Sequence, residues 1–290
     1  MEMNVSNQEH EVVAKKKGGL NPAIVIPILF VIGVCIFLFV LGNPSNFVSN
    51  PKIDGASSVA FADIASKDLH PAEGKPMGIV YMGGPIVPIL VTFMLTVIVF
   101  SFERFFVLKK AAGSGDLETF VHSIRGFLGK NDINGALDEC DKQQGSVGNV
   151  VKEGLTTFKA LEHDNTLNKE QKLAALNKSL EEATSLEMPM LEKNMMILST
   201  LGTVATLVAL LGTVIGMIKA FAALGSGGGA PDSGALSVGI SEALVNTALG
   251  IGTSAVAIIF YNFFTSKIDG LTYKIDEIGM SIQQSFAEHN

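Results

Sequence analysis

The stretch AIVIPILFVIGVCIFLFVLG, residues 23–42, contains no charged side chain in twenty residues. A membrane-spanning helix needs about 20 predominantly apolar residues, because each residue advances about 1.5 Å across about 30 Å of hydrocarbon. Three further stretches meet this condition. They are residues 79–102, 195–225 and 235–266, which together carry only two charges. The sequence therefore predicts four transmembrane helices.

Charge is scarce in this chain and unevenly distributed. Only 17% of the 290 residues are charged, against about 25% in soluble domains, and the mean hydropathy is +0.39. Residues 103–194 hold 12 basic and 15 acidic side chains. This pattern excludes a disordered chain, and two cysteines exclude a disulfide-stapled module. The net charge of −7 argues against nucleic-acid binding. A soluble alternative would need four core helices well above the usual 11–12 residues.

Basic residues near the span ends predict the orientation of the chain, because Lys and Arg collect in cytoplasmic segments. Nine of them fall on one side of the predicted membrane and three on the other. The nine are Lys15, Lys16, Lys17, Arg104, Lys109, Lys110, Lys193, Lys267 and Lys274, and the three are Lys52, Lys67 and Lys75. Both termini and the large middle segment are therefore expected in the cytoplasm.

The predicted fold class is an all-α integral membrane protein with four transmembrane helices, the last two extended into a cytoplasmic helical bundle. The predicted segments follow in chain order. They are a cytoplasmic tail (1–21), helix 1 (22–42), a periplasmic loop (43–78), helix 2 (79–102), a cytoplasmic helical domain (103–194), helix 3 (195–225), a periplasmic loop (226–234), helix 4 (235–266) and a cytoplasmic C-terminal helix (267–290). A cleaved signal peptide is the alternative for helix 1, but its length and the lack of a small-x-small cleavage site disfavour it.

The charged middle segment has the apolar spacing of amphipathic helices. This spacing predicts helices over 116–129 and 133–142. A longer helix is expected from an N-cap at Asn168 through Met196 into the third span, with a kink at Pro189.

We find no catalytic constellation in the sequence. The five histidines are scattered without metal-ligand spacing, and no G-x-x-x-x-G-K-[ST] phosphate loop is present. The expectation is a protein that is not an enzyme and that needs no metal and no cofactor. Any work that it does must then draw on an ion gradient or a partner.

Polar side chains align on the last two spans, where membrane proteins keep functional groups. At 100° per residue, three sets share a helix face. They are Ser199, Gly202, Thr206 and Thr213 on the third span, Glu242, Asn246 and Thr253 on the fourth, and Thr247 with Ser254 about 100° away. A carboxylate at a helix centre costs about 2.5–3.5 kcal/mol, so Glu242 is expected to face protein or water, with snorkelling to the surface as the alternative. Lys219 is interpreted as an interfacial anchor.

Each of these features also has a purely structural interpretation. Thr and Ser in membrane helices often bond the carbonyl one turn back and do nothing else. Small residues spaced along a span favour close helix packing. The packing candidates are Gly202, Gly212, Gly216 and Gly250.

Four segments of the last two spans resemble the MotA/TolQ/ExbB proton channel family. They are LLGTVIGMI (210–218), GISEAL (239–244), NTALG (246–250) and FYN (260–262). Glu103-Arg104 at the end of the second span is also similar to that family. The resemblance covers roughly residues 80–285 and is greatest to ExbB and TolQ, of which ExbB is the biopolymer transport protein of the TonB system.

The resemblance implies a subunit of a proton-driven motor in the bacterial inner membrane. It implies a homopentamer around the single span of an ExbD- or TolR-like partner, whose membrane Asp carries the proton, and motion passed to a TonB-like protein that energises outer-membrane transport. The family's pore threonines match Thr213 and Thr247, and its membrane Glu matches Glu242. The full set of predicted proton-pathway residues is Thr213, Thr247, Glu242, Asn246, Thr206, Thr253 and Ser254.

One feature departs from ExbB and TolQ, which usually have three spans. The extra span at 23–42 gives the four-span layout of MotA, so the system that is energised stays open. The alternatives are TolQ-like envelope maintenance, a MotA-like, gliding or secretion motor, and a structural scaffold that conducts nothing.

Overall fold

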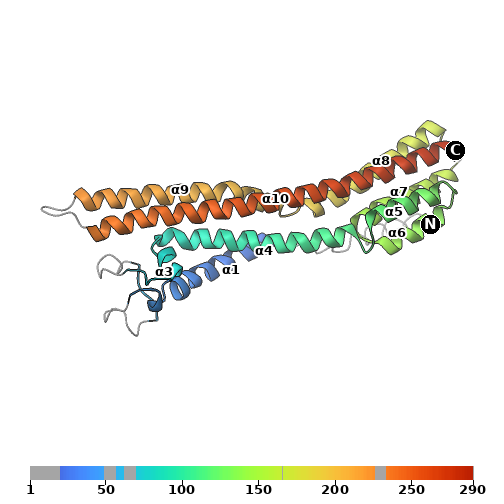
Figure 1. Ribbon diagram of the computed structural model, residues 1–290. Coiled ribbons are helices and arrows are strands. Elements are labelled where there is room, and N and C mark those ends of the chain that lie inside the picture. Colours follow the sequence, from blue (N-terminus) through green and yellow to red (C-terminus); the bar gives the residue numbers. More distant parts are fainter. Residues whose placement is uncertain (1–19, 49–56, 62–69, 165, 226–232, 290) are drawn as a thin grey trace, which may run out of the picture.

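The computed structural model describes residues 20–48, 57–61, 70–164, 166–225 and 233–289. Within these ranges the fold is α-helical, and the only β-type pairing is a single antiparallel bridge between Phe47 and Pro71. Figure 1 shows an elongated bundle with a group of shorter helices at one end. Nearly all of the predicted N-terminal tail and of the predicted loop at 226–234, and part of the loop at 43–78, lie outside the described residues.

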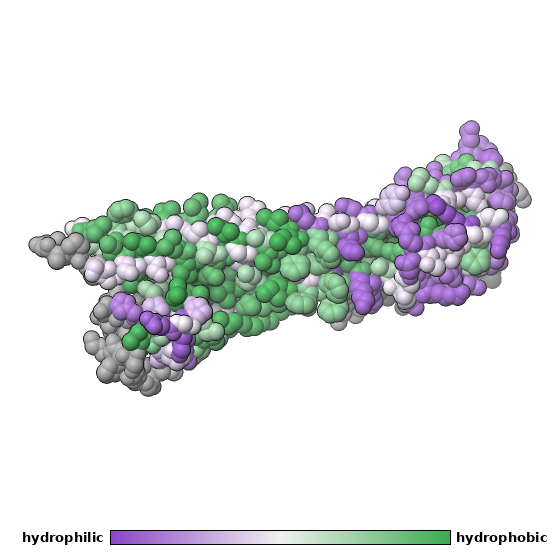
Figure 2. All heavy atoms as spheres, in the orientation of Figure 1, coloured by the Kyte–Doolittle hydropathy of each residue, from purple (hydrophilic) through white to green (hydrophobic). Residues whose placement is uncertain are grey.

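Four helices are long and apolar enough to cross a membrane. They are α1 (Pro22–Cys35, continued by a π-helical turn, Ile36–Leu41), α4 (Val87–Ala112), α9 (Met195–Gly225) and α10 (Ser233–His289). Large apolar side chains on these helices point outward, and those of Ile24, Phe102 and Phe221 are more than 60% exposed. Figure 2 shows this hydrophobic surface continuing along the part of the bundle that holds all four helices. The prediction of an all-α integral membrane protein is confirmed.

The second predicted span, 79–102, is not one helix. A short helix α3 (Pro76–Tyr81) ends before the turn Gly84–Ile86, and α4 begins only at Val87. Gly84 has φ +78°, a left-handed conformation that glycine adopts without steric cost, and Pro85 follows it. The Gly-Gly-Pro sequence therefore divides the apolar run and places a turn at this end of the bundle, which we call the turn end.

The opposite end of the bundle is a helical head formed by four shorter helices and the C-terminal part of α10. The four are α5 (Leu117–Leu128), α6 (Ile133–Gln143), α7 (Gly145–Glu162) and α8 (Lys169–Glu192). The helices predicted at 116–129 and 133–142 are confirmed by α5 and α6. Asn168 caps α8 in a reciprocal capping box with Gln171, so the predicted N-cap is also confirmed.

The predicted continuous helix from Asn168 through Met196 is wrong. Helix α8 ends at Glu192, and Asn194 has φ +64° before α9 begins at Met195. Asn tolerates this left-handed conformation better than most residues, which explains a sharp joint at this position. Pro189 lies inside α8 and does not end it. We call the part of the bundle where the four apolar helices α1, α4, α9 and α10 lie together the apolar belt. Among these helices, only α10 runs without a break from the belt into the head.

Helix α10 is the axis of the molecule, because it packs along α9 through the belt and against α4, α5, α7 and α8 elsewhere. Its end is held in the apolar core of the head, where the rings of Phe286 and Phe158 meet edge to face with centroids 4.8 Å apart. Helix α1 lies against α4, and Gly33 permits this approach, because a Cβ there would come 2.5 Å from the Thr92 hydroxyl oxygen. The fold thus places the polar residues of α9 and α10 side by side.

Candidate functional site

A pair of threonines joins α9 to α10 near the middle of the apolar belt. The hydroxyl groups of Thr213 and Thr247 hydrogen-bond to each other, and both side chains are half-buried. Each hydroxyl oxygen also lies within hydrogen-bond distance of the carbonyl one turn back, Thr213 of Ala209 at 3.1 Å and Thr247 of Ala243 at 3.0 Å. Because a hydroxyl has one proton, the threonine that donates to its neighbour does not donate to its carbonyl at the same time. The structure therefore brings together the two threonines that the sequence singled out, although they come from different helices.

The two charges of the last two spans form an ion pair near the turn end. Lys219 Nζ donates to both carboxylate oxygens of Glu242, at 2.7 and 2.8 Å. The Glu242 side chain is 1% exposed and the Lys219 side chain 46% exposed. Glu242 faces protein, as expected, and does not snorkel. The interpretation of Lys219 as an interfacial anchor missed this partner, although the presence of one charge of each sign in adjacent spans was a usable signal.

Segments from outside α9 and α10 cover this ion pair. A Cβ added at Gly84, in the turn before α4, would lie 2.7 Å from Glu242 Oε1. The ring of Phe61 lies next to Gly84, since the same Cβ would come 3.0 Å from Phe61 Cζ. Its centroid is 5.8 Å from Lys219 Nζ, within the range of a cation–π contact. The carboxylate is therefore enclosed by α9, α10 and the polypeptide that connects α1 to α4.

Asn246 follows Glu242 by one helical turn and is completely buried. A Cβ added at Gly212 of α9 would lie 2.7 Å from its Nδ2. Among the described residues, neither Nδ2 nor Oδ1 of Asn246 has a hydrogen-bond partner. Buried amides are nearly always hydrogen-bonded, so this one requires an explanation.

The other predicted pathway residues separate into two groups. Thr253 and Ser254 are buried on α10, and the Ser254 hydroxyl donates to the Gly202 carbonyl. Thr206 is exposed on the surface of α9, so the structure does not bring it to the others. The predicted packing glycines Gly202, Gly212, Gly216 and Gly250 all lie where α9 and α10 touch, and a Cβ at Gly250 would come 2.1 Å from Ala209 Cβ.

A second buried ion pair lies at the head end of α4. Arg104 is completely buried and binds the adjacent Glu103 carboxylate through two nitrogens, each at 2.6 Å. Its third nitrogen donates to the carbonyls of Leu191 at 3.3 Å and Met190 at 3.4 Å, at the end of α8. This junction therefore fixes the joint between α8 and α9, a role that sequence reasoning did not assign.

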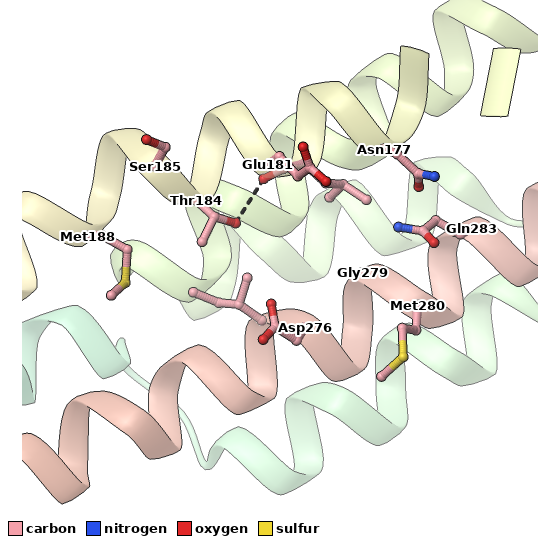
Figure 3. A pocket seen from close by; sticks show the side chains of 11 residues that line it. Asn177, Glu181, Thr184, Ser185, Met188, Asp276, Gly279, Met280 and Gln283 are labelled. Carbon is pink, nitrogen blue, oxygen red and sulfur yellow. Dashed lines mark hydrogen bonds between the residues drawn. The ribbon is translucent and has the colours of Figure 1, made fainter. Parts of the chain in front are cut away.

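The head contains a groove of 460 Å³ between α8 and α10 (Figure 3). The polar side chains that line it include Asn177, Glu181 and Asp276, and none of the predicted pathway residues reaches it. No group of three or more His, Cys, Asp or Glu residues in the described ranges could hold a metal ion. Burial raises the pKa of the Cys140 thiol to about 12, so this cysteine is a poor nucleophile.

Residues 143–277 match the model of the MotA/TolQ/ExbB proton channel family. This part of the chain, just under half of its length, is similar to that family. The matched residues include α7, α8, α9 and most of α10, and with them the threonine pair and the Lys219–Glu242 ion pair. Helix α1 and the loop that follows it lie outside the match.

Curated relatives are similar over part of their length. A putative biopolymer transport protein ExbB-like 3 of Synechocystis is 36% identical over 89 residues, which is 30% of this chain and 42% of that protein. The biopolymer transport protein ExbB of Xanthomonas campestris is 31% identical over 112 residues, 39% of this chain and 44% of that protein. The Tol-Pal system protein TolQ of Pseudomonas aeruginosa is 28% identical over 125 residues, 43% and 54% of the two chains. The matches thus span about half the length of these relatives.

Proposed function

We propose that this protein is the channel-forming subunit of a proton-driven motor in the bacterial inner membrane. In this proposal the head lies in the cytoplasm and the turn end faces the periplasm. The observation that carries the proposal is the arrangement on α9 and α10, where a hydrogen-bonded pair of threonines lies beside a buried carboxylate inside an apolar belt. Groups that can carry a proton are costly in such a belt and are usually kept there for function.

The threonine pair is suited to a pore wall. Its hydroxyls are half-buried and lie where two helices meet, so a polar path beside them would be lined by oxygen atoms that both donate and accept. Several copies, five by the family resemblance, would place these faces around the single span of an ExbD- or TolR-like partner. One charge that crosses 100 mV releases about 2.3 kcal/mol for motion. The proposed output is a TonB-like protein that energises outer-membrane transport.

The test is proton flux in proteoliposomes that contain this protein and its single-span partner. Thr213→Val and Thr247→Val remove the hydroxyls and keep the shape of the side chains, and each is expected to reduce flux at least about tenfold. Thr203→Val is the matched control, because Thr203 lies exposed on the same helix as Thr213 and is not a predicted pathway residue, and flux should be unchanged. Normal flux in both Thr213→Val and Thr247→Val would overturn the pore assignment.

A structural scaffold is the second candidate, and one observation favours it. Both threonine hydroxyl oxygens also lie within hydrogen-bond distance of the carbonyl one turn back, as they would in a helix pair that conducts nothing. Glu242→Gln separates the candidates, because it removes the ionisable group and keeps the shape. A conducting subunit would lose flux, whereas a scaffold would show no flux in either form. Co-purification of a short protein with one span and a membrane Asp would identify the partner, and the protein bound to that partner would distinguish TonB-like, TolQ-like and MotA-like systems.

A further inference from the structure

The buried amide of Asn246 lies one turn along α10 from Glu242, and both side chains are fully enclosed. Residues four apart on a helix are neighbours on one face, with Cβ atoms about 5–6 Å apart. The Glu242 carboxylate is bound by Lys219. A single carboxyl group therefore has a cationic partner and, one helical turn away, an amide that has no hydrogen-bond partner among the described residues.

These two neighbours suit different protonation states of the carboxyl group. An ionised carboxylate only accepts hydrogen bonds, and the three protons of an ammonium group match it. A protonated carboxyl group donates one hydrogen bond, and an ammonium group has no atom that can accept it. The Oδ1 atom of Asn246 can accept it, and it has no competing donor among the described residues. The amide thus matches the protonated acid.

Glycine backbone lies against both side chains, Gly84 against Glu242 and Gly212 against Asn246. At these points each side chain therefore meets backbone atoms and no Cβ. Among the described residues of the segments packed here (57–61, 84–102, 195–225 and 235–266), Lys219 and Glu242 are the only Asp, Glu, Lys, Arg or His residues. The Tyr81 hydroxyl of α3 donates to the Val59 carbonyl.

We propose that Glu242 is a two-position proton site, bound to Lys219 when ionised and to Asn246 Oδ1 when protonated. In the loading step the carboxylate accepts a proton from a hydronium ion, a new O–H bond forms, and a water molecule leaves. The Lys219 ammonium keeps its three protons and loses its attraction to the neutral acid. The side chain then turns, and its O–H group donates to the amide. This deepens the proposed function and rests on it for the claim that the stored proton is one that the channel conducts.

Infrared titration of the full-length protein in lipid vesicles tests the two positions directly. The carboxyl band of protonated Glu242 is identified by its loss in Glu242→Gln, and the pH at which the band is half-formed is measured. Lys219→Met removes the partner of the ionised form, so the midpoint should rise by about one pH unit or more. Asn246→Leu removes the partner of the protonated form, so the midpoint should fall by about half a pH unit or more.

Opposite shifts in the two variants are the result expected from the two-position site. Ser285→Ala is the control, because Ser285 is buried on the same helix at its head end, and the midpoint should not move. Lys219→Arg should restore the wild-type midpoint. If Asn246→Leu does not fold, Asn246→Ala makes the same test with a smaller side chain. An unchanged midpoint in a folded Asn246 variant overturns the proposal.

Proton flux is measured on the same variants to keep the two proposals apart. Opposite midpoint shifts with no flux in the wild type would support the proton site and contradict the channel function. Flux in the wild type with no midpoint shift in the Asn246 variant would support the channel and contradict the two-position site. Flux that falls in both Lys219→Met and Asn246→Leu, together with opposite shifts, would support both.

Discussion

Two buried ion pairs hold the apolar belt at its two ends, and they are built differently. The pair at the head end joins Arg104 to Glu103, and the side chains are 0% and 7% exposed. The pair at the turn end joins Lys219 to Glu242, and there the ammonium-bearing side chain is 46% exposed. Arg104 lies about 17 residues of α4, or about 26 Å, from the turn that touches Glu242.

The partners of each pair indicate its role. The remaining nitrogen of Arg104 donates to the Leu191 and Met190 carbonyls. The backbone N–H of Leu20 donates to the Glu103 carboxylate at 3.3 Å. This network joins α4 to the end of α8 and to Leu20, just before α1. The Arg104 guanidinium and the Glu103 carboxylate are therefore held by several hydrogen bonds each. The turn-end pair has a partly exposed lysine and, one helical turn away, an amide that has no hydrogen-bond partner among the described residues. We infer that the first pair is structural and that the second can open.

Loss of Arg104 is expected to have the largest effect. Arg104→Leu leaves Glu103 buried without its counter-charge and two carbonyls without a donor, so the free energy of unfolding should fall by about 3–5 kcal/mol. The measurement is denaturant or thermal unfolding in detergent. Arg125→Leu is the control, since Arg125 is half-exposed and pairs with Glu277 at 3.0 Å, and about 1 kcal/mol or less is expected. Equal losses in the two variants would contradict a structural role for Arg104.

A methyl group at Gly84 is expected to disturb the turn-end pair and the Phe61 ring next to it. Gly84→Ala places a side chain at φ +78° and 2.7 Å from Glu242 Oε1, so the free energy of unfolding should fall by about 1–2 kcal/mol. Gly252→Ala is the matched control on α10, where a Cβ would meet nothing within 4 Å. Because alanine favours a helix over glycine, this variant should gain about 0.5–1 kcal/mol. A gain in both variants would show that the turn does not press on the carboxylate.

Removal of Lys219 should cost less stability than removal of Arg104. The ammonium group is partly exposed, and the carboxyl group left behind can take up a proton and become neutral. Lys219→Met is therefore expected to lower the free energy of unfolding by about 1 kcal/mol or less at neutral pH. If Lys219→Met lowers the free energy of unfolding as much as Arg104→Leu does, both ion pairs stabilise the fold to the same extent and the distinction between them is wrong.

The smallest effect is expected from the partly buried ion pairs of the head, which lie at neither end of the apolar belt. The Lys274 ammonium donates to Glu277 and holds the pKa of that carboxyl below its ordinary value of 4.5, with Arg125 of α5 adding to the effect. A lowered pKa stabilises the fold above the ordinary value, and this contribution is lost as the pH falls through the lowered one. Hydrogen exchange of α5 should therefore increase on acidification below about pH 4.5. Glu277→Gln should flatten that dependence, whereas Glu170→Gln, at an exposed position on α8, should not.

The sequence allowed prediction of the features that depend on local pattern. Uncharged runs located the spans, apolar spacing located α5 and α6, and an Asn followed three residues later by Gln located the start of α8. The features that it did not predict depend on how helices are rotated against one another. A helical period places Lys219 and Glu242 on faces of their own helices, but it does not say that those faces meet. The break at Asn194 was not predicted because the hydropathy pattern does not report the backbone conformation of a single asparagine.

Helix α10 has 57 residues and no joint, whereas the neighbouring path from α8 to α9 is jointed at Asn194. At 1.5 Å per residue α10 is a rod of about 85 Å, with Glu242 near one tip and Phe286 packed in the head near the other. In a long straight helix, a small change in tilt angle at one end produces a large displacement of the other end. A tilt of about 5° at the carboxylate would move the far tip by about 6 Å, roughly one helical turn. If protonation of Glu242 tilts α10 as a rigid body, the head end of the helix moves directly, and no chain of side-chain rearrangements between the two ends is needed.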